Sequence, residues 1–139
     1  MTLVLDASVV IKWLFQDPER EDWTSQATAL MGAAVHGEVA LLQPPHWLAE
    51  VAAVLARETP EHARRDVQLL AQLGFAEQGG GAVLTRACTL SIELDHHLFD
   101  TLYHALAIEH QATLVTADDR YYRKAAAKPG ILHLSDWTR

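Results

Sequence analysis

Residues 2–11 read TLVLDASVVI: a short apolar run, a single aspartate and a second apolar run. Residues 2–5 predict a buried strand, because the run is short and carries no charge. The run stops at Asp6, and residues 7–15 predict a short helix. This order of strand, carboxylate and helix returns near the other end of the chain, at TLVTADDRYY, residues 113–122.

Strands and helices are predicted to alternate over the whole length. Further strands are predicted at residues 39–42, 113–116 and 131–134. Further helices are predicted at residues 23–35, 46–57, 60–73, 86–94, 99–110 and 119–127, with an acidic turn at 17–22 and a flexible glycine loop at 79–81. The alternation predicts an α/β fold with one domain over residues 1–139. Its central, mostly parallel, twisted sheet of four to five short strands is flanked by helices in an α/β/α arrangement.

The bulk composition is that of an ordinary globular domain and excludes several classes of protein. Half of the 139 residues are hydrophobic and 21% are charged. The single cysteine, Cys88, excludes an intramolecular disulfide and a cysteine-based zinc site, and fits the reducing cytoplasm. The first residues lack a basic segment and a cleavage site, so they predict a core strand rather than a signal peptide. No uncharged run is long enough to cross a membrane, and we expect no membrane partner.

Four lone carboxylates interrupt otherwise hydrophobic runs: Asp6, Glu50, Asp100 and Asp118. A carboxylate in apolar surroundings is costly unless something compensates its charge. Four such residues argue for a shared compensator, and a divalent cation is the simplest, since hard cations prefer carboxylate oxygens. In a parallel sheet, ligands bind at the carboxyl ends of the strands, and Asp6 and Asp118 both fall at such an end.

Each of these acids also has an ordinary structural explanation. Asp6 could cap the helix that follows it, although Ser8 could do the same. Asp100 stands at the start of a helix, where the helix dipole favours an acid. Glu50 could face solvent, but no other charge occurs at residues 46–56, so this helix hardly has a solvated face.

The last acidic position is ambiguous, because Asp118 and Asp119 are adjacent. Strand alternation puts Thr116 and Asp118 on one face and Asp119 on the other. We therefore assign Asp118 to the site and Asp119 to the cap of the helix that follows. His104 lies four residues after Asp100 on the same helix face, where it could orient Asp100, contact a substrate or simply pack.

Together these segments resemble the PIN-domain nucleases, and in particular the VapC-type toxins of bacterial VapBC toxin–antitoxin pairs. The matching segments are VLDASVVIKWL, PPHWLAEVAAVLAR, FDTLYHALA and TLVTADDRYYRKA, which span nearly the whole chain. The resemblance implies a single PIN domain over residues 1–139. It implies that the catalytic and metal-binding residues are Asp6, Glu50, Asp100 and Asp118, accompanied by Ser8 and Thr116.

The resemblance also implies an activity and its partners. It implies an endoribonuclease that depends on Mg²⁺, with Mn²⁺ able to substitute, and that is inhibited by a cognate antitoxin protein. We therefore expect a cytoplasmic toxin that cleaves RNA and forms a homodimer. On this hypothesis Asp6 and Asp118 hold one ion, while Glu50 and Asp100 hold a second ion or position the attacking water.

The net charge of −7 does not by itself suggest nucleic acid binding. Basic residues are nevertheless concentrated after Asp118, and Arg120, Arg123 and Lys124 could form a local rim that binds RNA phosphates. A solvated helix face explains the same three residues equally well.

Other kinds of site fit less well. A haloacid-dehalogenase-type phosphatase would need an aspartate where Ser8 stands, and the HExxH motif of zinc hydrolases does not occur. The adjacent residues His96 and His97 are poorly placed to chelate a metal from one helix face. The remaining alternative is a non-catalytic PIN-like domain that binds a metal or a partner without cutting RNA.

Overall fold

A computed structural model describes residues 1–15, 19 and 21–138 of the chain. Asp17 and Pro18, which belong to the predicted acidic turn, lie outside the described residues, as does Arg139. Within the described part of that turn, Glu21 forms an ion pair with Lys12, at 2.7 Å. No helix among the described residues is long and apolar enough to cross a bilayer.

Strands and helices alternate along the chain, as the sequence predicts. The strands are β1 (Thr2–Leu5), β2 (Ala40–Gln43), β3 (Ala76–Glu77), β4 (Thr113–Thr116) and β5 (Ile131–His133). The helices are α1 (Ala7–Leu14), α2 (Thr24–Val35), α3 (Trp47–Glu58), α4 (Ala63–Gln72), α5 (Gly81–Leu94), α6 (Leu98–Glu109) and α7 (Asp119–Ala125). A short 3-10 helix, η1 (Leu134–Asp136), follows β5.

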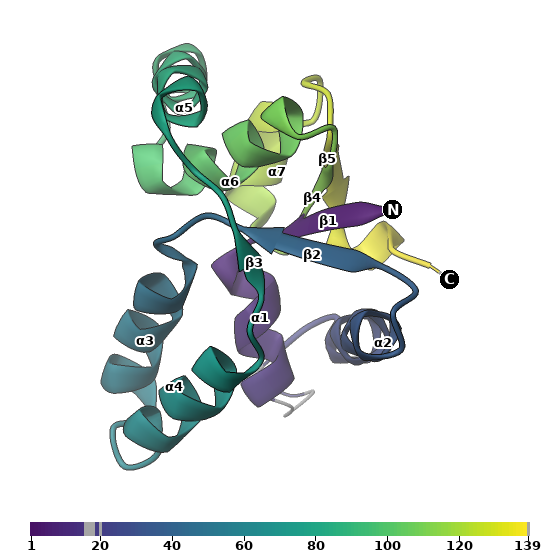
Figure 1. Ribbon diagram of the computed structural model, residues 1–139, viewed down its shortest axis with the longest axis vertical. Coiled ribbons are helices and arrows are strands. Elements are labelled where there is room, and N and C mark those ends of the chain that lie inside the picture. The colour runs from purple at the N-terminus through teal and green to yellow at the C-terminus, as the bar shows by residue number, and fades with distance from the viewer. Residues whose placement is uncertain (16–18, 20, 139) are drawn as a thin grey trace.

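The five strands form one parallel sheet in the order β3-β2-β1-β4-β5. Leu3 pairs with Leu41 on one side and with Thr113 on the other, which places β1 at the centre. Figure 1 shows helices on both faces of the sheet, with α5, α6 and α7 on one face and α1, α2, α3 and α4 on the other. The predicted α/β/α fold with a parallel sheet is confirmed.

The central strand is buried on both faces. Leu3, Val4 and Leu5 are completely inaccessible to solvent. Strands covered by helices on both faces carry continuous apolar runs instead of an alternating pattern, which explains the opening TLVL. Polar groups can therefore reach solvent only where such a strand ends, and Asp6 is the first residue beyond the end of β1.

Two segments differ most from the sequence prediction, and α4 begins three residues after its predicted start at residue 60. The strand β3 was not predicted, because it has two residues, both exposed, and so lacks the length and the apolar pattern of a strand. The helix α5 begins at Gly81, well before the predicted start at residue 86. Gly80 is the N-cap of this helix, with a φ of 109°, a conformation that favours glycine. The last residue of the predicted glycine loop, Gly81, is therefore helical.

A buried glutamine at the end of β2 fixes the end of β1. The Gln43 side chain is fully buried. Its Oε1 accepts a hydrogen bond from the backbone N–H of Leu5 at 2.7 Å, and its Nε2 donates to the Leu5 carbonyl at 2.9 Å. Buried backbone groups need partners, and here one side chain supplies both. Gln43 therefore sets the position of the peptide that leads directly into Asp6.

Replacing Gln43 with leucine is expected to lower the free energy of unfolding by about 2–4 kcal/mol, because both backbone groups of Leu5 would be buried without a partner. The measurement is urea denaturation in the presence of EDTA. The exposed Gln72, at the end of α4, provides the control, and its replacement with leucine should change stability by no more than about 0.5 kcal/mol. Equal stability of the two variants would contradict the role given to Gln43.

Candidate metal centre

Asp6 lies between β1 and α1 and is the N-cap of α1. Its Oδ2 accepts hydrogen bonds from the Ser8 backbone N–H at 3.3 Å and from the Ser8 hydroxyl at 2.5 Å. The Ser8 hydroxyl oxygen in turn accepts from the Ala117 N–H at 3.0 Å, which ties α1 to the end of β4. Asp6 rather than Ser8 is thus the cap, and Ser8 fixes the orientation of the Asp6 carboxylate.

Asp118 occupies the equivalent position after β4. It is the N-cap of α7, and its Oδ1 accepts from the Tyr121 N–H at 3.1 Å. The Thr116 hydroxyl links the two acids, since its oxygen accepts from the Asp118 N–H at 3.1 Å and its hydrogen is donated to Asp6 Oδ2, at 3.3 Å. The carboxyl ends of the neighbouring strands β1 and β4 therefore place Asp6 and Asp118 together.

Asp119 has a different partner. Its Oδ1 lies 2.7 Å from His133 Nε2, and its side chain is 69% exposed. The prediction that Asp119 caps the last helix is therefore wrong, because the Asp118 side chain makes that hydrogen bond. A capping side chain must precede the first helical turn, and the helix begins at Asp119 itself.

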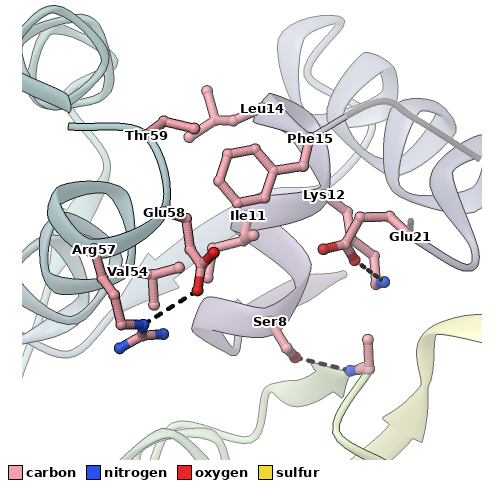
Figure 2. Close-up of a pocket in the computed structure, with 11 residues that line it drawn as sticks. Ser8, Ile11, Lys12, Leu14, Phe15, Glu21, Val54, Arg57, Glu58 and Thr59 are labelled. Carbon is pink, nitrogen blue, oxygen red and sulfur yellow. Dashed lines mark hydrogen bonds and ion pairs between the residues drawn. The ribbon is translucent and has the colours of Figure 1, made fainter. Parts of the chain in front are cut away.

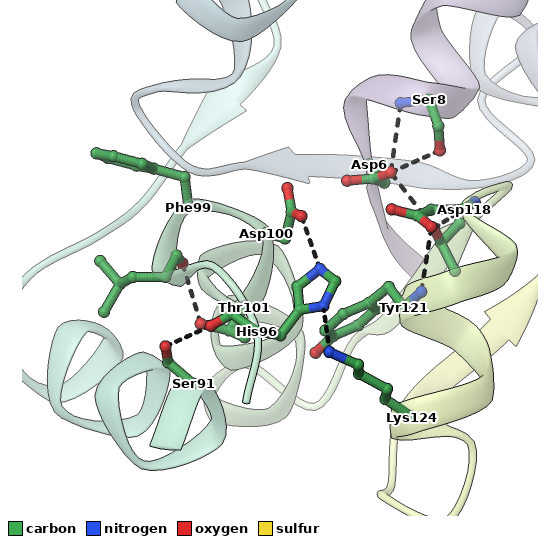
Figure 3. Close-up of polar contacts among 12 residues, drawn as sticks. Asp6, Ser8, Ser91, His96, Phe99, Asp100, Thr101, Asp118, Tyr121 and Lys124 are labelled. Carbon is green, nitrogen blue, oxygen red and sulfur yellow. Dashed lines mark hydrogen bonds and ion pairs between the residues drawn. The ribbon is translucent and has the colours of Figure 1, made fainter. Parts of the chain in front are cut away.

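Asp100 reaches the same place from the first turn of α6. Its Oδ2 lies 2.8 Å from Nε2 of His96, a residue in the turn between α5 and α6. Ligand atoms of His96, Asp100 and Asp118 all lie within 4.8 Å of one another. Figure 3 shows the side chains of Asp6, Asp100 and Asp118 converging from three separate parts of the chain.

Glu50 lies at the margin of this cluster. Its Oε1 is 3.4 Å from Nε2 of His46, the same atom that lies 2.9 Å from the Phe99 carbonyl oxygen, and the Glu50 side chain is 29% exposed. Burial lowers the pKa of His46, but the hydrogen bonds to Glu50 and Phe99 and the charges of Glu50 and Asp100 outweigh that effect and raise it. Glu50 therefore lies beside His46 and Tyr103, and the charge of Asp100 acts on the same two residues, in agreement with a helix face that is not simply solvated.

The three aspartates share one feature that suits a cation. Asp6 and Asp100 each engage Oδ2 with protein donors, and Asp118 engages Oδ1. Their other oxygens make no hydrogen bond with any residue that the structure describes. Open carboxylate oxygens on three neighbouring aspartates match the preference of hard divalent cations such as Mg²⁺ and Mn²⁺.

Electrostatic repulsion marks the same cluster. Burial raises the pKa of Asp6 to about 6, the Ser8 hydrogen bonds oppose this rise, and the neighbouring carboxylates of Asp100 and Asp118 add to it. A nearby positive charge favours the charged form of such a carboxylate. A bound cation would supply it.

A buried phenol also faces the acids. Tyr103, on α6, is fully buried, and its hydroxyl lies beside the Glu50 carboxylate but outside the geometry of a normal hydrogen bond. Burial raises its pKa far above the ordinary value, and the charges of Glu50, Asp6 and Asp100 and the hydrogen bond to Glu50 raise it further. The hydroxyl therefore remains a neutral donor that faces the Glu50 carboxylate.

His104 does not contact Asp100. It is fully buried, its Nδ1 accepts from the Tyr121 hydroxyl at 2.8 Å, and its Nε2 donates to the Pro129 carbonyl at 2.7 Å. Burial lowers the pKa of His104, which keeps the ring neutral. Of the three roles considered for His104, the structure supports packing, because both ring nitrogens already have partners away from the acids.

The basic residues after Asp118 divide into two kinds. Arg120 and Arg123 are exposed. Lys124 is half-buried, and its Nζ donates to the Asp95 carbonyl at 2.6 Å and lies 3.4 Å from Nδ1 of His96. Only the two arginines are thus directed to solvent, and Lys124 is engaged beside the acidic cluster.

A groove of about 740 Å³ opens beside the cluster, between α1 and the carboxyl end of α3. Ser8 lies at its end nearest the acids, and apolar side chains such as Ile11 and Phe15 form its walls (Figure 2). The Arg57 guanidinium stands at its rim, paired with Glu58 at 3.2 Å. The groove leads from the surface to the residues that hold Asp6.

Three side chains at the site, those of His46, His96 and Tyr103, are not candidates in the sequence analysis. A signal existed for His46 and Tyr103, since each lies one helical turn from an acid: His46 four residues before Glu50, and Tyr103 three residues after Asp100. His96 lies outside α6, so helical spacing gave no signal for it.

The fold and the acidic cluster define the class of protein: the chain belongs to the PIN domain family, whose profile matches residues 3–127. Among solved structures, it is similar to a chain of a toxin–antitoxin complex from Klebsiella pneumoniae, with a TM-score of 0.64 and 18% identity over 95% of this chain and 97% of that one. It is also similar to PAE2754 from Pyrobaculum aerophilum, with a TM-score of 0.65 and 16% identity over 97% and 90% of the two chains. At these identities the likeness concerns the fold. A sequence search of curated proteins found no match.

Proposed function

We propose that this PIN domain is an Mg²⁺-dependent endoribonuclease that cleaves RNA phosphodiester bonds and accepts Mn²⁺ in place of Mg²⁺. The observation that supports this function is the meeting of Asp100 and Asp118 beside Asp6, which Thr116 links to Asp118, each with one oxygen that no described residue engages. Mg²⁺ in enzymes typically takes one or two protein carboxylates and keeps several waters. Three open carboxylate oxygens and a fourth acid nearby exceed what one such ion takes, so the acids suit one tightly held ion and a second that arrives with the substrate.

The ion, when bound, supplies charge neutralisation at the phosphate and a water of lowered pKa. Asp6, Asp100 and Asp118 would hold it through the carboxylate oxygens that no described residue engages. Glu50 Oε2, on the carboxylate that His46 orients, accepts the proton of the attacking water. Arg120, exposed at the start of α7, contacts a neighbouring phosphate of the RNA.

We further propose that the protein is the toxin of a VapBC-type pair, acting in the cytoplasm as a homodimer and held inactive by its cognate antitoxin protein. Two observations support this proposal: the four motifs that span the chain, and the shared fold with a chain of the K. pneumoniae toxin–antitoxin complex. Light scattering of the purified protein, alone and co-expressed with the neighbouring gene product, tests the assembly.

The activity is tested with protein purified free of any partner and incubated with structured RNAs in Mg²⁺, in Mn²⁺ and in EDTA. Cleavage is expected with both ions and not with EDTA, and it should be lost in Asp6→Asn and Asp100→Asn. Cleavage that survives EDTA, or that is equal in the variants, would overturn the proposal. Metal binding without cleavage of any RNA would favour the alternative, a PIN-like domain that binds metal or a partner without catalysis.

Replacing Tyr103 with phenylalanine separates a role in the reaction from a role in packing. The Tyr103 hydroxyl faces Glu50, the base of the proposed mechanism, and a hydrogen bond to a charged group contributes about 1.5–3 kcal/mol, so cleavage should fall roughly 10- to 100-fold. The stability of the metal-free protein should change little, because the hydroxyl does not reach the geometry of a normal hydrogen bond there. Single-turnover cleavage and urea denaturation measure the two effects, with Tyr122→Phe as the control. Lower stability with unchanged cleavage would assign Tyr103 to packing alone.

A further inference from the structure

His96 is held rigidly beside the acidic cluster. Its carbonyl accepts from the Ser91 hydroxyl at 2.5 Å, and its N–H donates to the Ser91 carbonyl at 3.1 Å. Its side chain is 4% exposed and packs edge-on against the Tyr121 ring, with 4.9 Å between ring centroids. These contacts fix the backbone and the ring of His96 independently of its contact with Asp100.

The neighbours of the two ring nitrogens determine which one carries the hydrogen. Nδ1 lies 3.4 Å from the Nζ of Lys124, an ammonium that can donate but cannot accept. Nδ1 must therefore be the acceptor, and in the neutral ring the hydrogen belongs to Nε2. Nε2 then donates to Asp100 Oδ2 at 2.8 Å. The Asp95 carbonyl, 2.6 Å from Nζ, holds Lys124 in place, so a chain of donors runs from Lys124 through His96 to Asp100 (Figure 3).

We propose that His96 is a positioning residue, which Lys124 keeps in the Nε2–H tautomer and which fixes Asp100 so that its Oδ1 faces the cation. The proposal rests on the metal site of the proposed function and adds that His96 itself is not a ligand. A metal-bound histidine almost always donates its other ring N–H to an acceptor, whereas Nδ1 here faces a donor.

The arrangement has two consequences for the chain. It keeps the first coordination shell all-oxygen, which suits Mg²⁺ and Mn²⁺, whereas an imidazole ligand would favour Zn²⁺, Ni²⁺ or Cu²⁺. It also changes the role of Lys124, which was predicted to contact RNA: its positive charge acts on the site through His96.

The test measures Mn²⁺ affinity by electron paramagnetic resonance, without RNA, in the wild type and in His96→Gln, His96→Leu and Lys124→Met. Glutamine can place an amide donor near the position of Nε2, so His96→Gln should bind Mn²⁺ nearly as well as the wild type. His96→Leu should lose about 10- to 100-fold in affinity, the typical effect of removing an outer-shell partner. Lys124→Met should lose affinity by a smaller factor. The exposed neighbour His97 supplies the control, since His97→Gln should bind like the wild type.

Two measurements on the wild type do not depend on the folding of any variant. The ¹⁵N chemical shifts of the His96 ring, recorded at about pH 8, above the ordinary histidine range, should report the Nε2–H tautomer. The spectrum of bound Mn²⁺ should show no coupling to a directly bound imidazole nitrogen. Such a coupling, the Nδ1–H tautomer, or a His96→Leu variant with wild-type affinity would overturn the proposal.

Failure of this inference is distinguishable from failure of the proposed function. If the wild type binds Mn²⁺ and Asp100→Asn does not, the metal site stands, and His96→Leu alone decides the role of His96. If the wild type binds no Mn²⁺, both the metal site and the role of His96 are wrong.

Discussion

Replacing Asp118 with asparagine is expected to reduce RNA cleavage by ~100-fold or more, whereas the same change at Asp119 should alter it by no more than about twofold. Both residues lie at the start of α7, and they differ in their surroundings. Asp118 lies with His96 and Asp100 in the acidic cluster, while Asp119 is exposed and bound to His133. Removing one carboxylate ligand should weaken the binding of the ion, and such an ion stabilises the transition state by several kcal/mol.

The pair of variants is closely matched. Asparagine is as good an N-cap as aspartate, so in Asp118→Asn the side-chain oxygen can still accept from the Tyr121 N–H, and α7 should remain intact. Cleavage is compared at saturating Mg²⁺ and again over a range of Mg²⁺ concentrations, to separate lost ion affinity from lost rate. If cleavage fell more in Asp119→Asn than in Asp118→Asn, Asp119 would be the metal ligand and the assignment of Asp118 would be wrong.

Replacing Asp6 with asparagine should abolish cleavage and at the same time stabilise the metal-free protein at neutral pH. The folded-state pKa of Asp6 is about 6, against an ordinary value of 3.8 for this side chain, so the folded state binds the proton more strongly. The contribution of this group to stability is fully present below about pH 4 and is lost as the pH rises through 6. At pH 7 the charged Asp6 therefore costs up to about 3 kcal/mol, which asparagine would remove.

The expected pH dependence gives this prediction its control. Urea denaturation in EDTA should show Asp6→Asn more stable than the wild type at pH 7, with the difference shrinking towards pH 4. Added Mn²⁺ should reverse the order at pH 7, because a ligand at about 1,000 times its dissociation constant stabilises the wild type by about 4.1 kcal/mol and has little affinity for the variant. A variant less stable than the wild type in EDTA at pH 7 would contradict the raised pKa.

Much of this architecture could be predicted because it depends on short-range patterns. The buried run at β1, the strand at β4 and the alternation with helices each follow from local hydrophobicity. Parallel topology then places Asp6 and Asp118 at one edge of the sheet without any knowledge of side-chain contacts. The positions of Asp6 and Asp118 and the cap at Asp6 were therefore accessible from the sequence, while the cap at Asp118 was not, because two adjacent aspartates could supply it.

What could not be predicted depends on three-dimensional neighbours. His104 and His96 are both four residues from Asp100, and helix periodicity alone favours His104 because it lies in the same helix. The structure turns His104 towards Tyr121 and Pro129, and the tight turn held by Ser91 brings His96 to Asp100 instead. The two-residue strand β3 escaped prediction for a similar reason, since it is a strand only through its pairing with β2.

The helix caps at Asp6 and Asp118 have a consequence for the thermodynamics of ion binding. Each side chain is already immobilised by the helix that it caps. The entropic cost of ordering it is therefore part of the free energy of folding and is not added again when the cation binds. The site is preorganised, and its affinity should depend on how firmly the first turns of α1 and α7 are formed. A substitution that loosens either turn should weaken cation binding, even if it replaces none of the residues that bind the cation.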